Sequence, residues 1–161
     1  MKRKFYLIVF PSLAVLALDQ LTKWIIVRTI PIHKSIPVMD GFLNLVHVRN
    51  RGMAFGLMNR VGGDLPFYLL VFLTLAAVFL LVFWAARLKP GEQRILPGLS
   101  FILGGALGNL VDRVRLGEVI DFLDVYVGSF HWPAFNVADS AITLGTIWVA
   151  LNLLFRHPSG P

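Results

Sequence analysis

Long apolar runs separated by short polar stretches dominate this chain. The clearest run, Leu65 to Ala86, contains no charged residue. A helix of about 20 apolar residues crosses a hydrocarbon core of about 30 Å, so this run predicts a transmembrane helix. Three further runs have a similar character. Together they predict four spans, at about residues 5–27, 65–86, 95–113 and 134–155.

The first run allows two interpretations. It begins after the basic segment Lys2-Arg3-Lys4, and a basic start before an apolar run is also typical of a secretory signal peptide. The polar stretch Asp19 to Lys23 breaks the far end of the run, but apolar character resumes at Trp24 and three more spans follow. These features favour a transmembrane helix.

Two long connections, at about residues 28–64 and 114–133, join the spans on one side. Lys and Arg are divided almost evenly between the two sides. Those on the side of the N-terminus, however, lie in short segments next to helix ends, where the positive-inside effect acts. Both termini are therefore expected in the cytoplasm, with both connections outside.

The first outer connection has a pattern of its own. Phe42 to Arg49 is rich in β-forming residues and precedes a turn signal at Gly52, which predicts a small sheet on the membrane surface. The second connection is expected as an outer loop. The fold class is thus a mainly α membrane protein with four transmembrane helices, a small extracytoplasmic β-sheet and a second outer loop.

The composition supports one integral membrane domain that covers residues 1–161. Hydrophobic residues make up 57% of the chain and charged residues 15%, and the mean hydropathy is +0.72. One water-soluble core of this size would not bury so much apolar surface. The absence of Cys excludes disulfides, thiolate metal ligands and a cysteine nucleophile. The net charge of +6 fits the topology and contacts with anionic phospholipid, and no nucleic-acid role is indicated.

Two aspartates are the main candidates for chemistry, because carboxylates at membrane depth are costly and usually functional. Asp121 lies in the apolar segment Val119–Phe122, and Asp139 lies in the first turns of the fourth span. Asp124 follows Asp121 by three residues, and the local pattern does not choose between them. Asn136 shares a helix face with Asp139, but the two could equally be an N-cap and a favourable charge near the helix N-terminus.

Other polar residues recur at i,i+4 spacing, which places them on one helix face. Asp19 and Lys23 are either an interfacial ion pair with a snorkelling lysine or part of a site. Asn109 and Arg113 lie at the outer end of the third span, where an arginine either anchors the helix or binds a carbonyl or phosphate. The four glycines between Gly98 and Gly108 predict close helix packing.

A close pair of carboxylates suits acid–base catalysis, because like charges at short range share one proton. One carboxylate takes a proton from water while the other polarises a carbonyl, and the proton then passes to the leaving amine. Rival peptidase mechanisms lack their motifs: there is no His-Glu-x-x-His segment, and Ser140 is not in a Gly-x-Ser-x-Gly elbow. Two alternatives come from functional classes other than enzymes. One is a small transporter or proton relay, and the other is a non-catalytic scaffold.

Five short motifs together resemble the prolipoprotein signal peptidases, the bacterial type II signal peptidases, which are intramembrane aspartic peptidases. The resemblance covers nearly the whole chain, and five motifs in order are far more specific than any one of them. The motifs are Asp19-Gln20-Leu21-Thr22-Lys23, Asn50-Arg51-Gly52-Met53-Ala54-Phe55, Gly108-Asn109-Leu110-Val111-Asp112-Arg113, Val119-Ile120-Asp121-Phe122 and Phe135-Asn136-Val137-Ala138-Asp139-Ser140.

The resemblance implies that Asp121 and Asp139 are the catalytic pair and that Asp124 is a surface acid. It also implies a substrate cleft and groups that support the site. These roles fall to Asn50, Asn109, Arg113 and Asn136 in the cleft and to Asp19 and Lys23 as support. A separate hypothesis rests on Gly52 and Gly56, the glycines that flank Phe55: the outer β segment and Phe55 cover the cleft. Arg51 and Met53 stand where the family often has Thr and Ala, which bears on substrate preference.

The function implied by the resemblance is removal of the signal peptide from a diacylglyceryl-modified prolipoprotein, on the N-terminal side of the lipidated cysteine. No metal or other cofactor is expected. The implied location is the bacterial cytoplasmic (inner) membrane, with the active site at the outer face. The protein is expected to be a monomer surrounded by membrane phospholipid.

Overall fold

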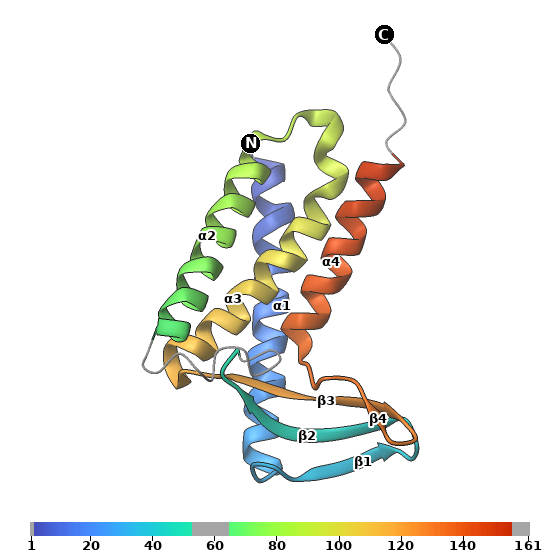
Figure 1. Ribbon diagram of the computed structural model, residues 1–161. Coiled ribbons are helices and arrows are strands. Elements are labelled where there is room, and N and C mark those ends of the chain that lie inside the picture. The colour runs from blue at the N-terminus through green and yellow to red at the C-terminus, as the bar shows by residue number, and fades with distance from the viewer. Residues whose placement is uncertain (1, 53–64, 156–161) are drawn as a thin grey trace.

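The computed structural model describes residues 2–52 and 65–155 (Figure 1). Within this part of the chain, four helices are long and apolar enough to cross a membrane, which confirms the four predicted spans. They are α1 (Lys2–Thr29), α2 (Leu65–Arg87), α3 (Leu96–Leu116) and α4 (Val137–Leu154), and a short 3-10 helix, η2 (Pro90–Ile95), leads into α3. Met53 and Phe55 lie outside the described residues.

The first helix continues through its polar stretch, and Asp19 and Lys23 lie on one helix face, as their i,i+4 spacing predicts. The Asp19 and Lys23 side chains are 0% and 2% exposed and form an ion pair. Leu18 and Leu21, in the same part of the helix, are about half exposed. The polar groups therefore lie inside the bundle and the apolar ones outside it.

The third helix occupies the centre of the bundle and contacts α1, α2 and α4. Its glycines permit the predicted close packing. A Cβ atom added to Gly105 would lie 2.4 Å from the carbonyl oxygen of Ala138 in α4, and one added to Gly104 would lie 2.6 Å from that of Ser12 in α1. In contrast, α2 exposes large apolar side chains such as Phe79, as a lipid-facing helix would.

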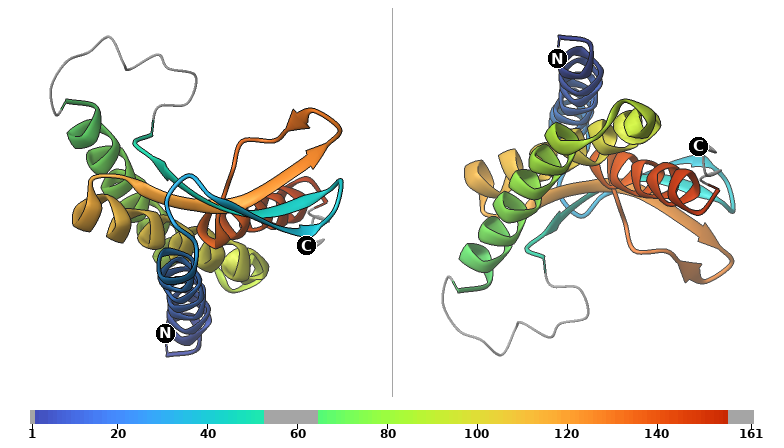
Figure 2. Two further views of the ribbon diagram at one scale, coloured as in Figure 1. Left: turned by 90° about the horizontal axis from the view of Figure 1, so that it is seen from below. Right: turned by 90° about the horizontal axis from the view of Figure 1, so that it is seen from above.

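A four-stranded antiparallel sheet lies at one end of the bundle, below the helices in Figure 1 and across the bundle end in Figure 2. The strands follow the order β1 (Ser35–Met39), β2 (Leu43–Asn50), β3 (Val119–Val127) and β4 (Phe130–His131). The predicted sheet is confirmed. The second connection is more than the expected loop, because β3 pairs with β2 and satisfies backbone groups that an edge strand would leave open.

A small apolar core attaches this sheet to the bundle. Ile26 and Ile30, in the last turns of α1, pack against Ile120 and Phe122 of β3. The first turn of α1 and the last turn of α4 both lie at the opposite end of the bundle (Figure 1). The fold thus places β3 across the ends of the helices, where its polar side chains meet those of α1, α3 and α4.

Candidate active site

Asp121 lies on β3, in register with Val48 of β2, and only 3% of its surface is exposed. Two side-chain amides hydrogen-bond to its carboxylate. Asn136 donates to Oδ1 at 2.7 Å, and Asn50 donates to Oδ2 at 3.0 Å. The sheet register therefore brings Asn50, from the first outer connection, to the candidate acid.

Asp139 lies in the first turn of α4, where it takes part in a capping box with Asn136. The Asn136 side chain accepts a hydrogen bond from the Asp139 N–H at 2.9 Å, and the Asn136 N–H donates to Asp139 Oδ2 at 3.3 Å. Asn109 of α3 donates to Asp139 Oδ1 at 2.8 Å. The carboxylate thus has partners from two helices.

Asn136 connects the two aspartates. Its side-chain oxygen caps the helix that carries Asp139, and its backbone N–H donates to the Asp139 carboxylate. Its fully buried side-chain nitrogen donates to Asp121. The helix cap and the hydrogen bond to Asp121 are thus made by the same residue. The structure therefore brings Asp121 and Asp139 into one hydrogen-bonded cluster, although they belong to a strand and a helix.

The surroundings of Asp121 favour its protonated form. Burial is the largest cause, the hydrogen bond from Asn50 opposes it, and the charge of Asp139 adds to it. Together with smaller opposing contributions from Asn136 and Lys23, these effects raise the pKa of Asp121 from 3.8 to about 6. The cluster can therefore hold a proton at a pH at which ordinary aspartates have lost theirs.

Lys23 forms the centre of a second layer of polar groups. Its ammonium lies 2.9 Å from Asp19 Oδ2 and 2.7 Å from Asp112 Oδ2, and it donates to Asn109 Oδ1 at 3.0 Å. Because this contact uses the oxygen of the Asn109 side chain, it leaves the nitrogen to donate to Asp139. Lys23 thereby orients a group that contacts the candidate site.

Asp112 and Gln20 belong to this network, although neither was a predicted site residue. Gln20 donates to Asp112 Oδ1 at 2.9 Å, and the Ile120 N–H donates to Asp112 Oδ2 at 3.3 Å. Asp19 Oδ1 accepts from the Ala138 N–H at 2.9 Å. Gln20 lies in the motif Asp19–Lys23 and Asp112 in the motif Gly108–Arg113. Their positions in these motifs are the sequence signal that could have identified them. The network joins α1 and α3 to β3 and to the start of α4.

The remaining predicted residues lie around the cluster. The Arg113 side chain is half-buried, donates to the Asn109 carbonyl at 3.4 Å and interacts electrostatically with Asp139 and Asp121. Gly52 has a φ of +78°, which favours glycine, and its N–H donates to Asn50 Oδ1 at 2.8 Å. Phe55, expected over the cleft, is outside the described residues.

Asp124 is not the surface acid that was expected. It is 9% exposed and lies on the opposite face of β3 from Asp121, because the two are three residues apart on one strand. Asn44 donates to it at 2.9 Å, and His131 Nδ1 lies 2.8 Å from its other oxygen. Burial raises the pKa of Asp124, but these hydrogen bonds outweigh burial and lower it overall. Asp124 therefore belongs to a separate cluster.

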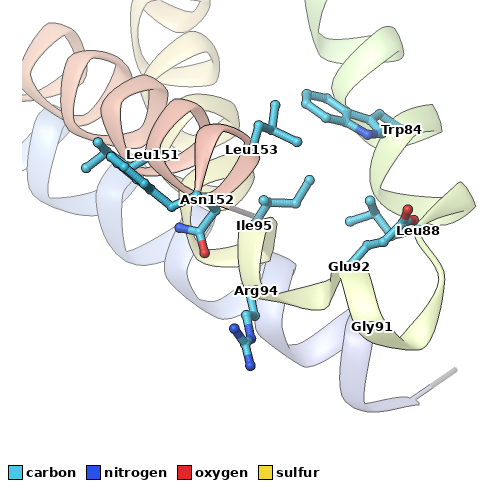
Figure 3. A pocket seen from close by; sticks show the side chains of 10 residues that line it. Trp84, Leu88, Gly91, Glu92, Arg94, Ile95, Leu151, Asn152 and Leu153 are labelled. Atoms are coloured by element: carbon cyan, nitrogen blue, oxygen red, sulfur yellow. The ribbon is translucent and has the colours of Figure 1, made fainter. Parts of the chain in front are cut away.

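A cavity of about 590 Å³ lies at the other end of the bundle, between the ends of α2 and α4 and η2 (Figure 3). It is lined by Trp84, Leu88, Gly91, Glu92, Arg94, Ile95, Leu151, Asn152, Leu153 and Phe155. None of the predicted site residues lines it. Over residues 2–52 and 65–155, no group of three or more His, Asp or Glu could hold a metal ion. The polar cluster beside the sheet remains the candidate site.

Comparisons with known proteins agree on one family. The family model described as signal peptidase (SPase) II matches residues 12–155. A lipoprotein signal peptidase of Syntrophus aciditrophicus is 43% identical over 159 residues, 98% of each chain. One of Syntrophotalea carbinolica is 45% identical over 98% of this chain and 94% of the relative. A solved bacterial membrane enzyme at 1.9 Å resolution is 33% identical, with a TM-score of 0.82 over 92% of this chain and 93% of that one.

Proposed function

Because the chain belongs to the signal peptidase II family, we propose that it is an aspartic endopeptidase in which Asp121 and Asp139 activate water. The family makes the chain a multi-pass bacterial membrane protein and a peptidase that acts on a prolipoprotein. The observation that carries the catalytic proposal is the position of Asn136, which hydrogen-bonds to both carboxylates. Two acids held by one residue, through its side chain and its backbone N–H, form a pair that can share a proton.

The catalytic cycle assigns different roles to the two acids. Asp121, with its raised pKa, carries the proton and donates a hydrogen bond to the oxygen of the scissile carbonyl. Asp139 accepts a proton from water as the water oxygen attacks the carbonyl carbon, and Asp121 transfers its proton to the carbonyl oxygen. The intermediate collapses when Asp139 gives its proton to the leaving nitrogen, the C–N bond breaks, and Asp121 recovers its proton.

The neighbouring amides hold the pair ready for this exchange. Asn109 and Asn136 keep the two carboxylates in fixed orientations, and Lys23 fixes Asn109. Their positions are set before substrate binds, so little reorganisation is needed during reaction. Arg113, half-buried and near both acids, is placed to bind a carbonyl or ester oxygen of the substrate.

The proposed substrate is a diacylglyceryl-modified prolipoprotein, cut on the N-terminal side of the lipidated cysteine. The site lies where the ends of the helices meet the sheet, so an acyl-anchored cysteine would hold the scissile bond at the depth of the two acids. We place this end at the outer face and both termini in the cytoplasm, following the charge distribution. One chain supplies both acids, which supports a monomer acting within phospholipid as a single domain of residues 1–161.

The experiment compares a lipidated prolipoprotein with the same protein carrying an unmodified cysteine, using purified enzyme in detergent. We expect cleavage of the lipidated form only, and mass spectrometry should find the lipidated cysteine as the new N-terminal residue. Equal cleavage of both forms would contradict the lipid requirement. A new N-terminus elsewhere would contradict the proposed bond.

A further inference from the structure

We propose that Glu118 is a positioning residue for the reaction: it holds Arg49 and Arg51, the two neighbours of Asn50, and so keeps the Asn50 amide against Asp121. This inference rests on the proposed function. It concerns a cluster on the rim of the site, where the last residues of β2 meet the first residues of β3.

The cluster consists of one carboxylate and two guanidinium groups. Glu118 Oε1 lies 2.9 Å from Arg49 Nη1, and Glu118 Oε2 lies 3.5 Å from Arg51 Nε. The Glu118 side chain is 15% exposed and that of Arg49 33%, whereas that of Arg51 is 73% exposed. The contact with Arg49 is therefore shorter and better shielded, and we expect it to contribute most.

Asn50 is the residue whose position the contacts of Glu118 with Arg49 and Arg51 would stabilise. It is the last residue of β2, is exposed, and pairs with Val119, the first residue of β3. Strand ends open more readily than strand centres, since they have neighbours on one side only. Glu118 directly precedes Val119, so its bonds to Arg49 and Arg51 add side-chain links on both sides of Asn50.

The position of Asn50 matters for the chemistry. Its amide nitrogen donates to Asp121 Oδ2 at 3.0 Å, and its amide oxygen accepts the Gly52 N–H, which fixes the orientation of the amide. This hydrogen bond favours ionised Asp121 and opposes the effect of burial on its pKa. If Glu118 no longer held the strand end, Asp121 would keep its proton to a higher pH.

Other charged groups also act on Asp121, and they come from the three helices packed around it. They are Asp139 from α4, Lys23 from α1 and Arg113 from α3. Within residues 2–52 and 65–155, the ion pairs and hydrogen bonds of these groups are with residues other than Glu118, Arg49 and Arg51. A variant at Glu118 should therefore change the Asn50 contribution and leave the others in place.

The test is the pH dependence of kcat/KM for a lipidated prolipoprotein, measured for the unmodified protein, Glu118→Gln, Asn50→Ala and the double variant. Asn50→Ala should move the alkaline limb, where kcat/KM falls, upward by about one pH unit, with about a tenfold loss below it. Glu118→Gln should move the limb by about half a unit with about a threefold loss. The double variant should match Asn50→Ala alone, since both act through one hydrogen bond.

Further variants keep the test decisive. Arg49→Gln should reproduce Glu118→Gln, and Arg51→Gln should have a smaller effect, which also covers the case of a Glu118 variant that does not fold. Asp40→Asn, in the exposed turn between β1 and β2, is the matched control for loss of one negative charge and should leave the limb unmoved.

Three results would overturn the inference while leaving the function intact: an unmoved limb in Glu118→Gln and Arg49→Gln, additive effects in the double variant, or an equal shift in Asp40→Asn. A uniform loss of kcat/KM at every pH would show a merely structural role. Failure of the unmodified protein to cleave the lipidated substrate would instead contradict the proposed function itself.

Discussion

Replacing Lys23 by Met should be one of the most damaging single changes in this protein. Lys23 is 2% exposed, and its ammonium lies between Asp19 and Asp112, which are 0% and 3% exposed. Met has a similar length and no charge. The substitution therefore leaves two buried carboxylates without their shared cation, and it changes the formal charge of the cluster from −1 to −2.

The expected magnitude follows from this geometry. Removing one partner of a buried ion pair costs about 3–5 kcal/mol, because the other charge stays buried without compensation. Here two carboxylates lose their cation, at 2.9 and 2.7 Å. Hydrogen bonds from Ala138 and Gln20 remain and moderate the loss. We expect the free energy of unfolding to fall by about 4 kcal/mol. Cleavage should weaken as well, because Asn109 loses the donor that orients it.

Denaturant titration of the purified variants in detergent measures the effect. Lys23→Met with Asp112→Asn restores a cluster charge of −1, so the double variant should be more stable than Lys23→Met alone. Lys34→Met, at an exposed position, is the matched control and should change stability little. A loss below about 1 kcal/mol in Lys23→Met would refute the reasoning, as would a double variant no more stable than the single one.

Three other predictions concern packing and protonation. Gly108→Ala places a Cβ atom 2.5 Å from Asp19 Oδ2 and should cost about 1–3 kcal/mol of stability, whereas Gly91→Ala, with nothing within 4 Å, should be neutral; equal effects in denaturant titrations would contradict this. Because folding raises the pKa of Asp121 from 3.8 to about 6, the folded state binds more protons in this window, so unfolding free energy should fall as pH rises through it. Asp121→Asn should remove that slope, and an unchanged slope would refute the assignment. Asp124→Asn should retain cleavage within about twofold and lose about 1 kcal/mol of stability through its hydrogen bonds; a cleavage loss as large as that of Asp121→Asn would contradict the separation of the two clusters.

Much of the fold was predictable because membrane helices leave a strong sequence signal. The uncharged run from Leu65 to Ala86 fixes α2 almost to the residue, and the glycines of α3 indicate its central position. The i,i+4 spacing placed Asp19 and Lys23 on one face of α1, but the other partners of this ion pair were not predictable. Asp112 and Asn109 in α3 contact Lys23, and the Ala138 N–H in α4 donates to Asp19. The spacing along one helix does not show these contacts.

The candidate site was also predictable only in part. Spacing put Asn136 beside Asp139, and the motifs selected Asp121. The contribution of Asp112 was missed, because its partners Lys23 and Ile120 come from other elements. Likewise, the burial of Asp124 depends on strand pairing between two distant connections.

Arg51 shows how a departure from a family pattern gains a physical meaning in the structure. The sequence suggested an effect on substrate preference. In the fold, the Arg51 side chain faces Glu118, next to the residue that contacts Asp121. The proposed contact of Arg51 with Glu118 therefore concerns the positioning of Asn50 for catalysis as well as substrate recognition.

The most direct test of the central claim is the turnover number of Asp121→Asn and Asp139→Asn on a lipidated prolipoprotein, measured beside their unfolding curves. Asn keeps the shape of Asp and removes the titratable group. The account predicts that each variant folds and that each loses at least about a thousandfold in kcat, since each removes one member of the proton-sharing pair. A folded variant of either kind with undiminished kcat would contradict it.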